Sequence, residues 1–109
     1  MPMAKESNAR FKSKIFYALS DPIRIEILEY LKSGEKCVCE IGPHLDLIQP
    51  LASRHLKILK DTGLIRCRKE GTKRFYAVVD PKIFNILDGI TANLADSIKA
   101  EILKQMTCS

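Results

Sequence analysis

The sequence predicts a mainly α-helical single domain with one small β-hairpin, a winged helix-turn-helix flanked by a helix at each end. Three observations predict this fold. The chain has 109 residues, which is the size of one domain. Apolar residues recur every three or four positions in most of the sequence, as they do in helices that pack by one face. Two β-prone runs joined by a short Gly-containing turn interrupt this pattern once, at residues 64–79.

The N-terminal third is expected to hold two helices. Residues 1–8 are expected to be disordered, and residues 9–19 show the apolar spacing of a short helix. The next stretch, "SDPIRIEILEYLKSGE", carries strong helix signals. Asp21 can cap the N-terminus, Pro22 suits the first helical position, and Gly34 can end the helix.

A helix-turn-helix is expected over residues 37–61. A short helix spans about Cys37 to Leu45, the stretch "DLIQP" forms the turn, and Pro50 opens the second helix. Gly63 can adopt the left-handed conformation that ends this helix. In proteins with this motif, the second helix lies in the major groove of DNA.

The wing is expected over residues 64–79, where "LIRCRK" and "RFYAVV" flank a turn that contains Gly71. A single long helix is then expected over residues 81–106, with Asp80 as its cap and Pro81 in its first turn. Its apolar residues recur every three or four positions, and it would be about 35–40 Å long. That length exceeds what one small domain needs to cover itself.

The excess positive charge of the chain is concentrated in its central segment. The sequence holds 18 Lys and Arg against 13 Asp and Glu, a net charge of +5. Residues 51–80 alone hold eight basic and three acidic residues, whereas the segments on either side are balanced. Taken alone, such a run is most often a solvated surface. Next to a helix-turn-helix, it indicates a polyanionic partner.

Neither a membrane segment nor an enzyme site is indicated. No apolar run approaches the ~18 residues of a membrane span, and the N-terminus lacks the apolar stretch of a secretory signal. We therefore expect a cytoplasmic protein with no membrane partner. The sequence contains no Ser/His/Asp arrangement, Gly-rich phosphate loop or carboxylate pair that would indicate catalysis. We expect no enzymatic activity and no obligatory cofactor.

Polar and basic side chains of the second helix and of the hairpin are the candidate contacts with double-stranded DNA. Gln and Arg can read adenine and guanine edges bidentately, whereas Lys is better suited to phosphates. A basic hairpin can enter a minor groove or grip backbone phosphates, and the alternative is a basic hairpin without a role. The candidate residues of the helix are Gln49, Ser53, Arg54, Lys57 and Lys60. Those of the hairpin are Arg68, Lys69, Lys73 and Arg74.

Four stretches together resemble the ArsR/SmtB family of metal-sensing bacterial and archaeal repressors. They are "ALSDPIRIEILEYL", "CVCEI", "QPLASRHLKILKDTGLI" and "RKEGTKRFYAV", and the resemblance covers about residues 14–80. It implies a homodimer that represses a small operon and leaves its operator DNA when an effector binds. It also implies that His55, at a position where the family usually carries His, packs or contacts a DNA phosphate.

In this family the first and last helices form the dimer interface. That arrangement fits the apolar residues predicted on the helices at residues 9–19 and 81–106. The interface residues that the resemblance implies are Phe11, Ile15, Ile83, Leu87, Ile90, Leu94 and Ile98.

Cys37 and Cys39 are the candidate effector ligands. The stretch "CVCEI" resembles the "CVCDL" signature of the family's arsenic/antimony and cadmium/lead sensors, and these cysteines match its first two thiols. Soft thiolates favour soft ions, so the resemblance implies As(III) or Sb(III), or Cd(II) or Pb(II), as effector. Some arsenic sensors carry a third Cys where this chain has Gly42. The N-terminal cysteines of cadmium/lead sensors and the last-helix His of zinc and nickel sensors are absent.

The sequence leaves the third sulfur and the effector open. Cys67 alternates with Arg66 and Arg68 in a strand and is expected in the core, whereas Cys108 can complete a metal site or have no role. Residues two apart on a helix point about 200° apart, so both sulfurs of the pair reach one ion only where the helix start is unwound. The alternatives are a thiol redox-responsive repressor of the same fold and a constitutive DNA-binding module with structural cysteines.

Overall fold

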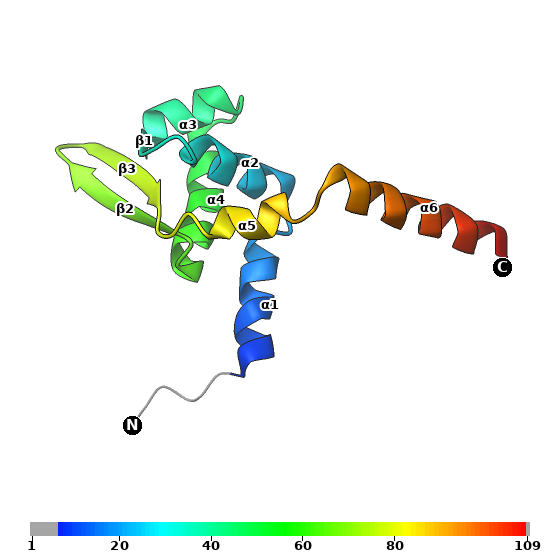
Figure 1. Cartoon of the computed structure of the whole chain (residues 1–109). Helices are drawn as coiled ribbons and strands as arrows, with labels where there is room; N and C mark the ends of the chain where they lie inside the picture. The colour runs from blue at the N-terminus through cyan, green and yellow to red at the C-terminus, as the bar shows by residue number, and fades with distance from the viewer. Residues whose placement is uncertain (1–6, 109) are drawn as a thin grey trace.

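The computed structural model describes residues 7–108, and Figure 1 shows packed helices with a wing on one side and a helix projecting from the other. The predicted winged helix-turn-helix, mainly α-helical with a small sheet, is confirmed. The helices are α1 (Asn8–Ala18), α2 (Pro22–Leu31), α3 (Val38–His44), α4 (Gln49–Thr62), α5 (Ile83–Asp88) and α6 (Ala92–Cys108). The strands are β1 (Lys36–Cys37), β2 (Ile65–Glu70) and β3 (Lys73–Val78). Within residues 7–108, none of the helices combines the length and the hydropathy of a membrane-spanning segment.

Helices α1 and α2 begin at residues that cap them. The Asp21 carboxylate accepts a first-turn N–H of α2 at 2.8 Å, and Pro22 occupies the first position of that helix, as predicted. The Ser7 hydroxyl accepts a first-turn N–H of α1 at 3.1 Å. The disorder predicted for residues 1–8 is therefore wrong for its last two residues, and residues 1–6 lie outside the described range.

The wing pairs with a short strand that the sequence does not predict. Strands β2 and β3 form the expected antiparallel hairpin, with Gly71 in its turn at a φ of 64°. Strand β1 pairs antiparallel with the other edge of β3, so the strand order is β1–β3–β2, and Cys37 lies opposite Phe75. Helix α3 begins at Val38 rather than at Cys37, because Cys37 has an extended backbone (φ −72°, ψ 145°).

The single helix predicted over residues 81–106 is wrong, because the chain forms two helices there. Helix α5 ends at Asp88, with Gly89 as its C-cap, and α6 begins after Thr91, whose hydroxyl accepts the Leu94 N–H at 3.2 Å. The apolar spacing continues through this break. Gly89 would be unfavourable in a helix interior, however, and Thr91 is a good N-cap. The break lets α6 leave the rest of the molecule (Figure 1).

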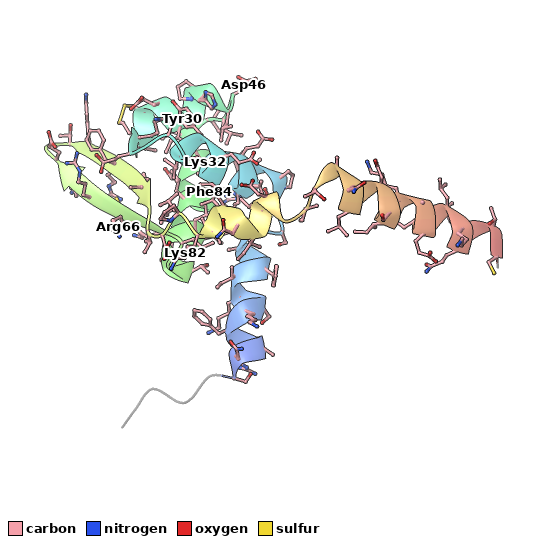
Figure 2. All side chains as sticks on the ribbon, in the orientation of Figure 1. Tyr30, Lys32, Asp46, Arg66, Lys82 and Phe84 are labelled. Carbon is pink, nitrogen blue, oxygen red and sulfur yellow. A yellow bond between two sulfur atoms is a disulfide. The ribbon has the colours of Figure 1, made fainter. Side chains whose placement is uncertain are left out.

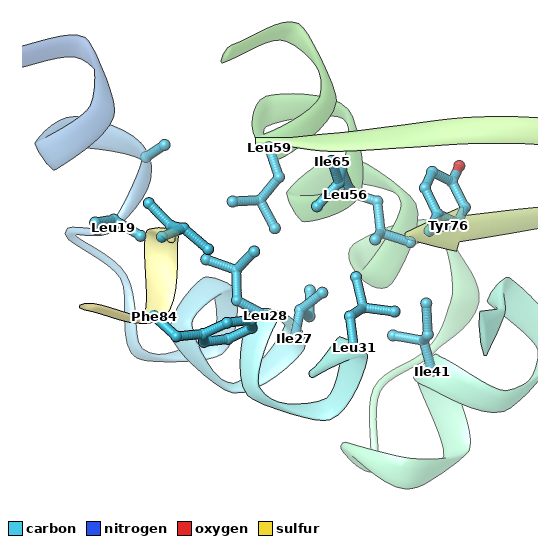
Figure 3. Packing of buried hydrophobic residues seen from close by; sticks show 12 residues of the cluster. Leu19, Ile27, Leu28, Leu31, Ile41, Leu56, Leu59, Ile65, Tyr76 and Phe84 are labelled. Carbon is cyan, nitrogen blue, oxygen red and sulfur yellow. The ribbon is translucent and has the colours of Figure 1, made fainter. Parts of the chain in front are cut away.

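The core lies between α2, α3, α4, α5 and the inner face of the sheet, with the end of α1 at its border (Figure 3). Its members are Ala18, Leu19, Ile27, Leu28, Leu31, Ile41, Leu56, Leu59, Ile65, Tyr76, Ile83 and Phe84. Helix α6 contributes no buried residue. The radius of gyration is therefore 17.1 Å, against about 13 Å for a compact chain of this length.

Candidate DNA interface and thiol pair

Helix α4 presents its polar side chains to a hollow beside the wing. Its buried side packs Ala52, Leu56 and Leu59 into the core, so residues three or four apart on the other side face outwards. A hollow of about 450 Å³ lies between this outer side and β3. Its lining residues are Val38, Gln49, Ser53, Lys57, Lys60, Arg74 and Tyr76. The structure thus brings together candidate DNA contacts from α4 and from the wing.

Two of the candidate contacts on α4, Arg54 and Lys57, differ in their surroundings. Arg54 is exposed, one position along from Ser53. Lys57 is also exposed, but its Nζ lies 2.8 Å from the Asp61 carboxylate one turn further on. This hydrogen bond holds the pKa of Asp61 below its ordinary value. Part of the charge of Lys57 is therefore already offset within the protein.

The tip of the wing gathers positive charge on opposite strands. Lys69 lies directly across from Arg74 in the β2–β3 register, and both side chains are exposed. Like charges in directly opposed positions repel each other and destabilise a sheet. Lys73, opposite Glu70, adds a third cation at the tip. A bound polyanion would relieve this repulsion, so the arrangement favours a partner such as a DNA backbone.

Arg68 is engaged within the protein, unlike its neighbours on the wing. Its Nε and Nη2 donate to the two carboxylate oxygens of Glu35 at 2.9 and 2.7 Å, and its Nη1 donates to Glu70 at 2.6 Å. The guanidinium also lies 4.6 Å from the ring centre of Phe75. These hydrogen bonds raise the pKa of Arg68 and lower that of Glu35. Because two carboxylates balance its charge, we remove Arg68 from the candidate DNA contacts.

His55 lies in the interior of the protein, so it packs, which is the first of the two roles implied for it, and we remove it from the candidate DNA contacts. Its side of α4 faces α2, and only 8% of the residue is exposed. Its Nδ1 lies 3.2 Å from Nη1 of Arg24, which is itself buried and donates to the carbonyl oxygen of Ala18 at 2.8 Å. Arg24 thereby joins the end of α1 to the buried side of α4. Its position within the apolar stripe of α2 was the available signal for this role, since a buried charge needs partners.

The two sulfurs of the thiol pair lie together at the start of α3. Cys37 and Cys39 are joined by a disulfide, and their Cα atoms are 5.1 Å apart. The pair is possible because Cys37 precedes the helix with an extended backbone, as the geometry of two sulfurs two residues apart requires. The Cys37 sulfur also accepts the Cys39 N–H at 3.2 Å, and the Glu40 carboxylate accepts the Cys37 N–H at 3.0 Å. Cys37 is therefore the N-cap of α3.

The other two cysteines lie apart from this pair. Cys67 is partly buried against the core beside Tyr76, as predicted, and Cys108 is exposed at the far end of α6 (Figure 1). Among residues 7–108, no three His, Cys, Asp or Glu side chains come together in a group that could hold a metal ion. Within one chain, Cys37 and Cys39 thus offer two sulfurs to an ion, and they do so only after their disulfide is reduced.

The apolar side of α6 is exposed along its length, and Figure 2 shows this helix standing clear of the core. Its exposed apolar residues are Leu94, Ile98, Ile102, Leu103 and Met106, with exposed fractions from 44% to 68%. Phe11 on α1 and Ile90 before α6 are also at least half exposed, whereas Ile15 and Leu87 pack partly against the core. Ile83 is buried in its own chain, so we remove it from the candidate interface.

The sequence matches the family model described as bacterial regulatory protein, arsR family, over residues 21–66. The chain is 45% identical over 76 residues to an uncharacterised helix-turn-helix-type transcriptional regulator of Methanocaldococcus jannaschii, covering 69% of this chain and 85% of that protein. It is 42% identical over 82 residues to the arsenical resistance operon repressor of Staphylococcus xylosus, covering 75% of each protein.

The fold is similar to a solved homodimeric winged helix-turn-helix DNA-binding domain from Mycobacterium bovis. The TM-score is 0.68 at 26% sequence identity, and the match covers 94% of this chain and 95% of that domain. The similarity therefore includes α6 as well as the central motif.

Proposed function

Because the chain belongs to the ArsR family of bacterial regulatory proteins, we propose that it is a homodimeric repressor that releases operator DNA when a soft metal or metalloid ion binds Cys37 and Cys39. The family and these relatives are DNA-binding transcriptional regulators rather than enzymes, so the chain is itself a DNA-binding regulator and not an enzyme. It acts on DNA in the cytoplasm and needs no obligatory cofactor.

The shared hollow between α4 and the wing is the observation that carries the DNA-binding part of this proposal. Helix α4 enters the major groove, where Gln49, Ser53 and Arg54 contact base edges. Lys57 and Lys60 on the same helix contact phosphates. The exposed cations of the wing contact the flanking backbone. They are Lys69, Lys73 and Arg74.

The dimer forms through α6 and the exposed side of α1. Within residues 7–108 no residue of α6 is buried, so a second chain would give its exposed apolar residues a covering surface. A two-fold dimer would present two copies of α4 to successive half-sites on one side of the DNA. The homodimeric domain from M. bovis supports this arrangement.

The effector site is the reduced Cys37–Cys39 pair. Each thiol loses its proton when it binds an ion, and two neighbouring thiolates suit As(III), Sb(III), Cd(II) or Pb(II). The relative from an arsenical resistance operon favours As(III) among these. Within one subunit, the end of α6 that carries Cys108 lies far from the start of α3, which carries Cys37 and Cys39 (Figure 1). Cys108 is therefore proposed as a third ligand only from the other subunit of the dimer.

A second candidate function is a response to oxidants, and the Cys37–Cys39 disulfide is the observation that favours it. Two thiols and one hydrogen peroxide molecule give one disulfide and two water molecules, so the peroxide takes up the two electrons that the sulfurs lose. The same pair of residues then reports oxidation instead of ion binding.

Both functions are tested by measuring DNA affinity with and without each effector. Fluorescence anisotropy of the reduced protein on a DNA duplex selected from random sequence is recorded with arsenite, Cd(II) and peroxide. We expect arsenite to lower the affinity of the wild type by about 5- to 150-fold, the usual range of allosteric coupling. Release by peroxide alone would replace the ion-binding proposal with the redox one.

Variants of single cysteines and of the Cys37/Cys39 pair show which thiols are needed for release of DNA by an effector. Replacing both Cys37 and Cys39 by Ser should leave DNA binding in place and abolish release. Cys67→Ser is the matched control, because it removes a thiol outside the pair. Cys108→Ser should weaken the response to arsenite only if this residue supplies the third sulfur. The proposal is wrong if the double variant is released by every effector as the wild type is.

A further inference from the structure

A bidentate ion pair ties the wing to the segment that carries the thiol pair. Arg68 in β2 contacts both carboxylate oxygens of Glu35 at 2.9 and 2.7 Å. Glu35 comes directly before β1 and two residues before Cys37. A planar two-point contact of this kind fixes orientation as well as distance. The wing therefore holds the chain immediately ahead of Cys37.

Backbone pairing gives a second link between Cys37 and the wing. Cys37 lies opposite Phe75 across β1 and β3, and Arg68 lies opposite Phe75 across β3 and β2. Directly opposed residues share one side of a sheet, so these three residues form a row across all three strands. Within this row, the Arg68 guanidinium lies over the Phe75 ring, 4.6 Å from the ring centre. A change in the backbone at Cys37 therefore reaches the wing through strand pairing and through the ion pair.

The same segment borders the hollow that faces DNA. Val38, between the two cysteines, lines this hollow together with Arg74 of β3 and the polar side of α4. A rearrangement of the two sulfurs that moves the backbone at Val38 therefore changes how α4 and the wing are placed relative to each other. The proposed DNA contacts come from both of these elements.

We propose that the Glu35–Arg68 ion pair and the β1–β3 pairing transmit the state of the Cys37–Cys39 sulfurs to the wing, which makes Arg68 a coupling residue. This inference rests on the proposed function of the thiol pair. The two carboxylates on Arg68 leave it little charge to offer a phosphate, whereas removing its side chain cuts the link between the sensing segment and β2. Such a connected path accounts for coupling only if its removal changes the response.

The test compares Arg68→Gln and Glu35→Gln with Lys69→Gln in the full-length reduced protein. Lys69 is the matched control, since it is the next residue on the same strand and its substitution removes the same charge. The Glu35 and Arg68 side chains are 35% and 50% exposed, and exposed ion pairs contribute little to stability, so the variants should fold. DNA affinity is measured for each variant with and without sodium arsenite and with and without peroxide.

We expect Arg68→Gln and Glu35→Gln to bind DNA within about threefold of the wild type and to lose most of the 5- to 150-fold release. The double variant should lose no more than Arg68→Gln, because Arg68→Gln already removes the contact with Glu35. Lys69→Gln should bind DNA more weakly and keep its full release. Wild-type release in both Gln variants would overturn the inference.

A measurement without DNA separates this inference from the proposed function. Hydrogen exchange of the β2 and β3 amides is compared between the reduced and the disulfide-bonded protein. The wild type should show a difference in the wing, and Arg68→Gln should lose most of it. An equal difference in both proteins, or none in the wild type, would overturn the coupling. If neither arsenite nor peroxide releases the wild type, the proposed function fails, and hydrogen exchange still decides the coupling.

Discussion

Substitution of Leu94 tests whether α6 is the surface that holds two subunits together. Leu94 is 44% exposed in the single chain, and full burial of a Leu side chain is worth about 1.5–3 kcal/mol. Covering the exposed part is therefore worth ~0.7–1.3 kcal/mol per copy. A two-fold dimer contains two copies, so Leu94→Ala should cost ~1.3–2.6 kcal/mol, or about a 10- to 70-fold weaker dimer.

Leu94→Asp should have a larger effect through the same contact. It buries two carboxylates without partners, at a cost of several kcal/mol each, so the variant should be monomeric at concentrations where the wild type is a dimer. Helix α6 should remain folded, because an acidic residue in the first turn suits the helix dipole. Circular dichroism checks the helix content, and sedimentation equilibrium over a range of concentrations gives the dimer constant.

Asp96→Ala is the control for this experiment, since Asp96 lies on the other side of α6 by helical geometry. It should leave the dimer constant unchanged. If Leu94→Asp sediments as the wild type does, another surface holds the subunits together. If Asp96→Ala weakens the dimer as much as Leu94→Ala, the apolar side of α6 has no special role.

Three other perturbations test the wing, the buried Arg and a buried Tyr. Replacing Lys73 and Arg74 by Ala should flatten the slope of log affinity against log salt concentration by about one for each phosphate that the wing no longer binds. An unchanged slope would show that the wing does not contact the DNA backbone. Arg24→Ala leaves His55 without its partner and should lower the free energy of unfolding by about 3 kcal/mol, seen as a lower urea midpoint. Burial raises the pKa of Tyr76 above its ordinary value of 10.0. The contribution of Tyr76 to stability should therefore be constant below that pH and be lost above it, with one phenol titrating late at 295 nm.

The parts of the fold that depend on local signals could be predicted from the sequence. Asp21 and Pro22 mark the start of α2, and Gly63 ends α4 with a φ of 88°. Strand β1 could not be predicted, because two residues are too few for an alternating pattern and the paired strand is distant in the chain. The break at Gly89 was missed because one Gly costs a helix only about 1 kcal/mol, so packing of α5 against the core decides it.

The surroundings of individual polar side chains were harder to predict than the elements that carry them. Arg54 and His55 are neighbours on α4, yet one is exposed and the other buried beside Arg24. Strand alternation correctly placed Arg68 on the side away from the core. Its partner Glu35 lies in a loop far away in sequence, and no local pattern indicates such a contact. Charge type alone therefore predicted a DNA contact where the structure has an internal ion pair.

Cys37 is both the N-cap of α3 and a proposed ion ligand, and two substitutions separate these two roles. Its sulfur caps α3 by accepting the Cys39 N–H, and an ion bound to that sulfur competes for the lone pairs that make the cap. An N-cap is worth about 0.5–2 kcal/mol, which overlaps the roughly 1–3 kcal/mol typical of allosteric coupling. Removal of the cap can thus supply much of the energy for DNA release.

Cys37→Ser keeps an N-cap and should bind DNA as the wild type does without responding to arsenite. Cys37→Ala removes the cap and should bind DNA up to about 30-fold more weakly with no effector present. Equal DNA affinity for the Ser and Ala variants, measured by anisotropy at one salt concentration, would show that the cap does not drive release.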